Sequence, residues 1–408
     1  MRAERQQGTG QLFEGNRIYG LDILRCYSIL MVMWVHAAIG LLPSQWHYWS
    51  QIIVFMDPIA PFYVLSGYLI GLILLQKVQA GAWNTNSLAR FFRQRFLRTL
   101  PLYYFMLIVY VLLNALLYDH FSKQGAVPYF FFLQNFRSYD IYFFEESWSL
   151  AVEVWFYISA AFILTAWYTL RPSIDAVLWT GLSIIIAAIS LRLYKYQIHP
   201  PKNTEDWNVS FRLIVTGAID YPAYGLVAAY LHVRFPQAWI KYKRRLLLGS
   251  LGTLLALFML ILICLRIFRS SDISLLTGFG WYLFLNTLAS LFIVSWLPFF
   301  SSISTGKGRV YKAVTYLSQR SYSLYLIHSS LVINIFFNTL VQHWLQVAGI
   351  RQGAGLSLLF FLCFWIITFV LAELSYRYVE LPFMNLRHRR PALAASLLGL
   401  FRKGGPNV

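Results

Sequence analysis

An arginine and a histidine stand eleven residues apart in an apolar stretch near the start of the sequence, LRCYSILMVMWVH at 24–36. On an α-helix, this spacing places Arg25 and His36 on one face, about 16 Å apart along the axis. Imidazole is the commonest general base in enzymes, and guanidinium groups bind anions such as phosphate. The pair is therefore predicted to act at two positions along one helix. In the structural alternative, Arg25 pairs with Asp22 or extends to the lipid headgroups, and His36 is a hydrogen-bonded core residue.

A cluster of arginines precedes Pro101 in the stretch RFFRQRFLRTLPLYY. Arg95 and Arg98 are three residues apart, so they face the same way on a helix. Guanidinium groups match phosphate oxygens in geometry, which predicts a site for a phosphorylated cofactor. The alternative is a juxtamembrane anchor that binds anionic lipid headgroups.

A glutamate lies inside the apolar stretch SWSLAVEVWFY at 147–157. Ser149 is four residues before Glu153, on the same helix face. Asp57 lies near the outer end of the second predicted span, at a depth in the membrane similar to that of Glu153 and His36. A carboxylate beside a histidine orients the ring and stabilises its protonated form, so Glu153 and Asp57 are predicted to lie beside His36. The alternative for Glu153 is a structural ion pair.

Other ionisable side chains occur inside apolar stretches. His328, in SYSLYLIHSSL, has either a direct role or a hydrogen bond to a neighbouring helix. Asp220 and Glu373 are predicted to be paired, because an unpaired charge within a membrane is costly.

Most of the chain consists of long apolar segments. Of its 408 residues 58% are hydrophobic and only 12% are charged, whereas soluble domains carry about 25% charged residues. Transmembrane strands would be alternating segments of about ten residues, but these segments approach or exceed the ~20 residues of a membrane helix. The sequence predicts an all-α polytopic membrane protein, a bundle of about ten transmembrane helices. The predicted spans are 18–42, 50–76, 101–118, 147–170, 174–193, 211–233, 246–268, 277–300, 314–338 and 354–378.

The distribution of lysine and arginine indicates which side of the membrane each loop faces. With the N-terminus inside, 23 of the 34 basic residues fall in inner segments and 8 in outer segments, while three lie within spans. Both termini are therefore predicted to be cytosolic. The net charge of +18 follows from this asymmetry and from attraction to anionic lipid, so no nucleic-acid partner is predicted.

The predicted organisation is a cytosolic N-terminal segment at 1–17, a transmembrane domain at 18–386 and a short basic cytosolic tail at 387–408. The first segment is polar, so we expect no cleavable signal peptide. All three cysteines fall within predicted spans, which argues against a disulfide framework. Neither a soluble second domain nor a metal site is predicted, and the oligomeric state stays open.

A series of short motifs resembles the acyltransferase-3 family of integral-membrane O-acyltransferases. Each motif is weak by itself, but the series covers nearly the whole chain in order. Many relatives have Glu-Arg-Pro where this chain has Glu380-Leu381-Pro382, a difference that removes one positive charge. The motifs are Arg25 and His36 with ten residues between them, FYVLSGYLIG at 62–71, RQRFLRTLPLYY at 93–104, SWSLAVE at 147–153, SYSLYLIH at 321–328 and YRYVELPF at 376–383.

The resemblance implies transfer of an acyl group, usually acetyl, from cytosolic acyl-CoA to a hydroxyl of a saccharide or glycolipid acceptor. It implies a multi-pass protein of the bacterial inner membrane, with acyl-CoA as a co-substrate and no permanently bound cofactor. The hydrolase-like periplasmic domain of some relatives is not expected here. Arg25, Arg95 and Arg98 would bind the phosphates of the donor, and His36 would act as the base. The motif also implies site roles for Ser147, Trp148, Ser149 and Glu153.

Several readings remain open. The favoured reaction is direct attack of the acceptor hydroxyl on the thioester, with Glu153, Asp57 or both stabilising the His36 imidazolium. An acyl-enzyme on His36 or Ser149 is the other route. The alternative functions are a transporter or flippase of a lipid-linked sugar, with the buried acids and histidines as a proton relay, and a scaffold without chemistry. A histidine-dependent membrane acyltransferase of another family is the rival fold.

Overall fold

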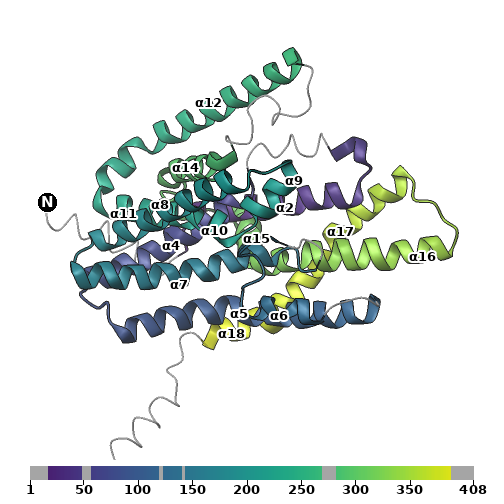
Figure 1. Cartoon of the computed structure of the whole chain (residues 1–408), viewed down its shortest axis with the longest axis horizontal. Coiled ribbons are helices and arrows are strands. Elements are labelled where there is room, and N and C mark those ends of the chain that lie inside the picture. Colours follow the sequence, from purple (N-terminus) through teal and green to yellow (C-terminus); the bar gives the residue numbers. More distant parts are fainter. Residues whose placement is uncertain (1–16, 48–56, 119–122, 140–142, 269–281, 387–408) are drawn as a thin grey trace, which may run out of the picture.

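The computed structural model describes residues 17–47, 57–118, 123–139, 143–268 and 282–386. The elements within these ranges are helices, and the long ones lie side by side in a bundle, with α12 along one edge (Figure 1). The predicted all-α class is thus confirmed. Residues 1–16 and the predicted tail at 387–408 lie outside the described residues. The longer helices are α2 (Tyr19–Leu41), α4 (Ala60–Gln79), α5 (Thr85–Leu117), α7 (Ser147–Leu170), α8 (Asp175–Ile198), α11 (Asp220–Arg234), α12 (Pro236–Phe268), α14 (Tyr282–Phe300), α15 (Gly308–Ile327) and α17 (Ala354–Ser375).

Shorter helical pieces connect or extend these helices. Three of them are π-helices, in which the backbone hydrogen bonds span five residues, and such segments are frequent at functional sites. The π-helices are η2 (Asn208–Arg212), η4 (His328–Val341) and η5 (Tyr376–Glu380). The other pieces are η1 (Lys123–Ala126), α6 (Val127–Phe130), α9 (Thr204–Trp207), α10 (Val215–Ala218), α16 (Gln342–Val347) and α18 (Leu381–Asn385).

Seven helices in the described ranges are long and apolar enough to cross a membrane, or eight if one bent pair is counted as a span. The bent pair is Glu205–Arg212 and Val215–Arg234, which meet at 86° where the sequence predicts one continuous span at 211–233. The apolar helix Leu285–Phe300 is shorter than these spans. The chain is therefore a multi-pass membrane protein, and the predicted count of ten spans is not confirmed.

The third span begins earlier than predicted. α5 starts at Thr85, where the Asn84 side chain accepts a hydrogen bond from the Ser87 amide (3.0 Å) and the Ser87 hydroxyl accepts one from the Asn84 amide (2.9 Å). This reciprocal capping stabilises a helix start. The helix then continues through Pro101, because neighbouring groups in a membrane bundle compensate for the missing amide. The helix therefore begins well before Pro101, the residue at which the sequence placed the start of the span.

Glycines allow α4 and α11 to pack with their backbones in contact. A Cβ on Gly67 would lie 1.7 Å from the carbonyl oxygen of Pro222, and one on Gly225 would lie 2.0 Å from that of Val64. Small residues are favoured at such crossings within membranes because close packing replaces the hydrophobic effect there. The crossing fixes the position of α4, one face of which lines the site described below.

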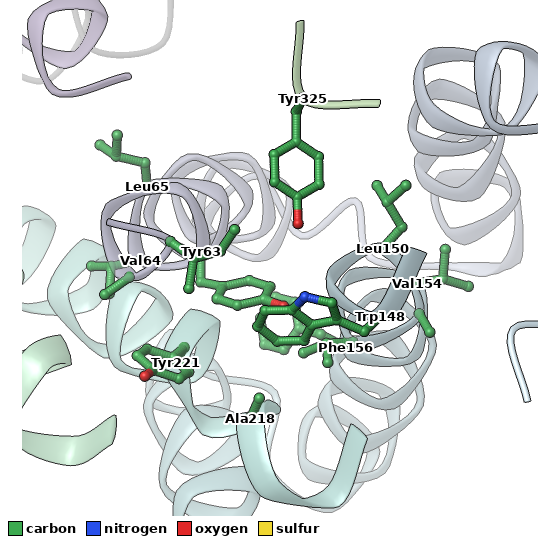
Figure 2. Packing of buried hydrophobic residues seen from close by; sticks show 14 of the residues in the cluster. Tyr63, Val64, Leu65, Trp148, Leu150, Val154, Phe156, Ala218, Tyr221 and Tyr325 are labelled. Atoms are coloured by element: carbon green, nitrogen blue, oxygen red, sulfur yellow. The ribbon is translucent and has the colours of Figure 1, made fainter. Parts of the chain in front are cut away.

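Aromatic side chains fill the bundle between α4, α7 and α11 (Figure 2). The ring centroid of Tyr63 lies 6.1 Å from that of Trp148 and 5.4 Å from that of Tyr221. In Figure 2 the hydroxyl of Tyr325, from α15, points toward the same group. Aromatic rings at these separations attract one another beyond the burial of their area. These aromatic contacts therefore help to hold α4, α7, α11 and α15 together.

A buried ion pair joins α8 to α11. Arg192 donates hydrogen bonds to the two carboxylate oxygens of Asp220 (3.1 and 2.6 Å) and to the carbonyl of Gly217 (2.8 Å). The predicted pairing of Asp220 is confirmed. Arg192→Met would leave a buried carboxylate without its cation, so the free energy of unfolding should fall by about 3–5 kcal/mol. Thermal unfolding of the detergent-solubilised protein measures this loss.

Arg377 provides the matched control. Its side chain is 65% exposed and pairs with Glu373, so Arg377→Ala should change the free energy of unfolding by only about 0–1 kcal/mol. Equal losses in the two variants would contradict the assignment of the Arg192 pair to the stability of the bundle.

Candidate active site

A cavity lies between α2, α4, α5, α7 and α15. The space between its walls, counted together with open solvent at the mouth, is about 810 Å³. Its walls combine apolar and aromatic side chains with a polar set that the sequence analysis had largely selected. The polar residues, tyrosines aside, are Arg25, Ser66, Arg95, Arg98, Thr99, Ser149, Glu153 and Ser321.

The three arginines predicted for the donor site all line this cavity. Arg25 comes from α2, while Arg95 and Arg98 come from adjacent turns of α5. Two separate helices thus bring three guanidinium groups to one cavity. This arrangement suits a ligand with several phosphate oxygens, because planar guanidinium groups bind such oxygens in pairs.

The structural alternative for Arg25 was a pairing with Asp22, and that contact is weak. The Asp22 carboxylate accepts hydrogen bonds from Arg17 and from the Ser318 hydroxyl, each at 2.7 Å. The nearest Arg25 nitrogen is 4.0 Å from the same carboxylate. Asp22 therefore ties α2 to α15, and the Arg25 side chain reaches the cavity.

Glu153 lies on the wall of the cavity, whereas His36 is not one of the lining residues. Its carboxylate accepts hydrogen bonds from the Ser66 hydroxyl (2.6 Å) and from the Tyr157 hydroxyl. Its hydrogen bonds thus go to residues other than His36, and a catalytic role of Glu153 stays a prediction. The reason is rotational: Glu153 and Tyr157 are one helical turn apart, and that face of α7 points to α4 and α5.

Asp57 also has partners other than His36. Its carboxylate accepts hydrogen bonds from Arg212 (3.1 Å) and from the Tyr221 hydroxyl (3.0 Å). The Arg212 guanidinium lies over the ring of Trp148, 5.7 Å from its centroid. Arg212 reaches this place because η2 and α10 break the predicted straight span. The sequence offers no sign of that break. The hydrogen bonds of Asp57 thus go to residues other than His36, and its catalytic role stays a prediction.

The partner of His36 is His328. The Nδ1 atom of His36 lies 2.7 Å from Nε2 of His328, and the two ring planes differ by only 10°. His328 is fully buried, whereas His36 is half-buried. Nδ1 of His328 lies 2.7 Å from the carbonyl oxygen of Tyr325, a residue that lines the cavity. The histidine pair is therefore adjacent to Tyr325, a residue of the cavity wall.

The sequence analysis missed Glu146. Its carboxylate accepts hydrogen bonds from the backbone amides of Ser329 (2.9 Å) and Ser330 (2.8 Å) and from the Ser330 hydroxyl (2.5 Å). One carboxylate oxygen lies 3.9 Å from Nδ1 of His328. The available signal was the adjacent pair Glu145-Glu146 directly before the tryptophan motif, in a stretch with few other charges.

The remaining motif residues hold the start of α7. The Ser149 hydroxyl lines the cavity and donates to the backbone carbonyl of Glu146 (3.1 Å). The Ser147 hydroxyl lies 3.1 Å from that of Tyr139 and accepts a hydrogen bond from Gln134 (3.3 Å). Trp148 packs between Tyr63 and Arg212, as described above. In the part of the chain that the structure describes, no three His, Cys, Asp or Glu side chains are grouped as metal ligands.

The chain matches a family model described as an acyltransferase domain over residues 18–377. It is 27% identical over 389 residues to a Staphylococcus aureus (strain COL) protein with a provisional O-acetyltransferase name; the match covers 90% of this chain and 57% of the relative. It is 26% identical over 349 residues to the peptidoglycan O-acetyltransferase OatA of Listeria monocytogenes, covering 79% of this chain and 50% of the relative. No solved structure matches the chain.

The relatives are longer than the region they share with this chain. A third, the O-acetyltransferase OatA of S. aureus strain NCTC 8325, is 22% identical over 389 residues, or 91% of this chain and 58% of the relative. The chain thus spans little more than half the length of the relatives it matches. The family match itself extends over almost all of the described helices. The chain belongs to the acyltransferase-3 family.

Proposed function

We propose that the chain transfers an acyl group, most simply acetyl, from acyl-CoA to a hydroxyl of an envelope saccharide. The observation that carries this proposal is one cavity with three arginines in its wall and a histidine pair that contacts Tyr325, another residue of the wall. Such a cavity suits a donor with phosphates at one end and a thioester at the other. The name of the Listeria relative favours a peptidoglycan sugar as the acceptor.

In the proposed donor complex, Arg25, Arg95 and Arg98 bind the phosphates through charge-assisted hydrogen bonds. The pantetheine arm extends along the cavity toward Ser149 and Tyr325. α2 is a continuous helix from Tyr19 to Leu41, so His36 lies about 16 Å from Arg25 along its axis. That distance is comparable to the length of the arm. The thioester would thereby come within reach of an acceptor bound beside His36.

The chemistry at His36 is general-base catalysis. As the acceptor oxygen forms a bond to the acyl carbon, its proton moves to the imidazole of His36. The carbon–sulfur bond then breaks, and the same proton passes to the departing thiolate of CoA. Glu153 lines the same cavity as the three arginines, so in this scheme it lies beside the donor. Direct transfer needs no covalent enzyme intermediate.

Cytosolic termini remain part of the proposal, from the distribution of basic residues. A reporter enzyme that is active only in the periplasm, fused after Val408, is expected to give no signal. A cytosol-active reporter at the same position is the control and is expected to give a signal. The reverse pair of results would place the arginines at the outer surface, away from a cytosolic donor.

The proposal is tested by turnover of acetyl-CoA with an envelope saccharide by the purified protein in lipid. Release of free CoA should depend on the acceptor, and mass spectrometry should find the acetyl group on the saccharide. Calorimetry should show binding of acetyl-CoA without the acceptor. Movement of a lipid-linked sugar across vesicles, with no binding of acyl-CoA, would instead identify a transporter.

A further inference from the structure

The donor and acceptor atoms of the histidine pair can be assigned by starting from the Tyr325 carbonyl. The carbonyl oxygen of Tyr325 can only accept, and it lies 2.7 Å from Nδ1 of His328. Nδ1 of His328 must therefore carry the proton. In the neutral ring Nε2 then has only its lone pair, so it accepts from the atom 2.7 Å away, Nδ1 of His36. His36 is left with a proton on Nδ1 and a bare Nε2.

The ring geometry suits this assignment. The two imidazole planes differ by 10°, and the ring centroids are 5.0 Å apart. Because the nitrogens are 2.7 Å apart, they lie close to the line between the centroids, and the N–H of one ring points at the lone pair of the other. A face-to-face stack would not give such a contact. His328 is fully buried, which disfavours a second proton on its ring.

Glu146 explains why the Tyr325 carbonyl is available to the ring. The last α-helical hydrogen bond of α15 runs from the His328 amide to the Leu324 carbonyl. The next two amides, of Ser329 and Ser330, donate to the Glu146 carboxylate, and the chain continues as the π-helix η4. The carbonyl of Tyr325 is thus released from Ser329 at the position where His328 needs an acceptor.

The Leu326 carbonyl, next along the break, receives the Tyr110 hydroxyl at 2.7 Å. Both carbonyl oxygens at the end of α15 are therefore satisfied by side chains, as buried backbone groups require. Side chains from two other parts of the chain therefore hold this break: Tyr110 of α5, and Glu146, which directly precedes α7.

We propose that His328 is a positioning residue that fixes the tautomer of His36, with the Tyr325 carbonyl as the anchor and Glu146 as the group that frees this carbonyl. The inference rests on the proposed function, since it makes Nε2 of His36 the atom that takes the acceptor proton. During transfer His36 gains this proton on Nε2 and keeps Nδ1–H donated to His328. The logic is that of a catalytic triad, with a second histidine in the place of the carboxylate.

The first test compares two substitutions of His328. Glutamine can place its side-chain oxygen near the position of Nε2 and accept from His36, so His328→Gln should keep kcat within about tenfold. His328→Leu removes the acceptor and should lower kcat by about 10²-fold or more, because the base loses its fixed tautomer. KM for acetyl-CoA and thermal stability should differ little between the two variants. Equal kcat in both variants, or a loss of donor affinity that matches the loss of kcat, would overturn the inference.

Glu146 supplies a second variant with a different outcome. Glu146→Gln keeps an oxygen that accepts from the amides of Ser329 and Ser330, so kcat should again stay within about tenfold. A loss as large as that of His328→Leu would show that the carboxylate acts through its charge, and would remove Glu146 from the positioning role.

A spectroscopic test does not depend on activity. In 15N solid-state NMR of the protein in lipid, the His36 ring, assigned by its absence in His36→Ala, should show a protonated Nδ1 and an unprotonated Nε2. His328→Leu should change this signal to a mixture of tautomers. A proton on Nε2 of His36 in the wild type would overturn the inference even if the protein is an acyltransferase. The expected signal without any turnover would count against the proposed function alone.

Discussion

Replacing His36 by alanine is expected to lower acyl transfer by about 10²–10⁴-fold, the usual contribution of a positioned general base. The loss should appear in kcat, because His36 does not line the cavity proposed to bind the donor. Turnover of acetyl-CoA with an envelope saccharide, measured beside calorimetric binding of acetyl-CoA, tests both parts. Binding should remain nearly intact.

His343 is the matched control for this substitution, since it is an exposed histidine on α16. His343→Ala should keep turnover within a factor of about two to three, as expected for a surface position. Thermal unfolding of both variants separates lost chemistry from lost structure. Near-normal turnover by a folded His36→Ala protein would exclude His36 as the base.

The second large effect concerns donor affinity. Loss of one charge-assisted contact to phosphate costs about 1.5–3 kcal/mol, so Arg98→Ala should weaken acyl-CoA binding by about ten- to a hundred-fold. Arg95→Ala should have a smaller effect in the same direction, and the double variant should bind more weakly than either. Binding should also weaken with added salt in the wild type, because the contacts are ionic.

Arg90 distinguishes a ligand site from general attraction to the basic helix. It is exposed near the start of α5 and does not line the cavity. Arg90→Ala should therefore leave acyl-CoA affinity within about twofold. If the Arg95 and Arg98 double variant bound acyl-CoA as tightly as Arg90→Ala, the two cavity arginines would be membrane anchors and nothing more.

The parts of the site that the sequence predicted correctly depend on spacing within one helix. The separation of eleven positions from Arg25 to His36 implies one face of α2, and that helix is continuous in the structure. The separation of three positions from Arg95 to Arg98 implies a shared face of α5, and both side chains line the cavity. Helical periodicity is local, so a single sequence is enough to apply it.

The errors concern contacts between helices and local breaks. Depth alone suggested that Glu153 and Asp57 lie beside His36, but depth does not set the rotation of a helix about its axis. The rotation of α7 directs Glu153 to Ser66, and the turn at η2 brings Arg212 to Asp57. Neither rotation nor the 86° bend follows from an apolar segment of suitable length.

The histidine pair joins residues almost three hundred positions apart in sequence. His36 and His328 were both selected as buried ionisable groups, yet nothing in either stretch indicates that they meet. Their contact depends on the break after α15, which in turn depends on Glu146 from another part of the chain. A contact that needs three separate segments cannot be derived from the periodicity of any one of them.

One consequence follows from the two ties between α2 and the α15–η4 helix. Asp22 meets Ser318 before the Arg25–His36 interval begins, and His36 meets His328 at its end. Both contacts are hydrogen bonds of 2.7 Å between side chains, and they hold α2 against its neighbour at both ends of the segment from Arg25 to His36. The distance between Arg25 and His36 is therefore fixed by the helical backbone between them. A donor held by the arginines would then be selected by the length of its carrier arm. A truncated thioester without the nucleotide would lack the phosphates that the arginines hold. A larger acyl group would change only the part of the donor attached to the sulfur, and would leave the phosphates and the carrier arm as they are.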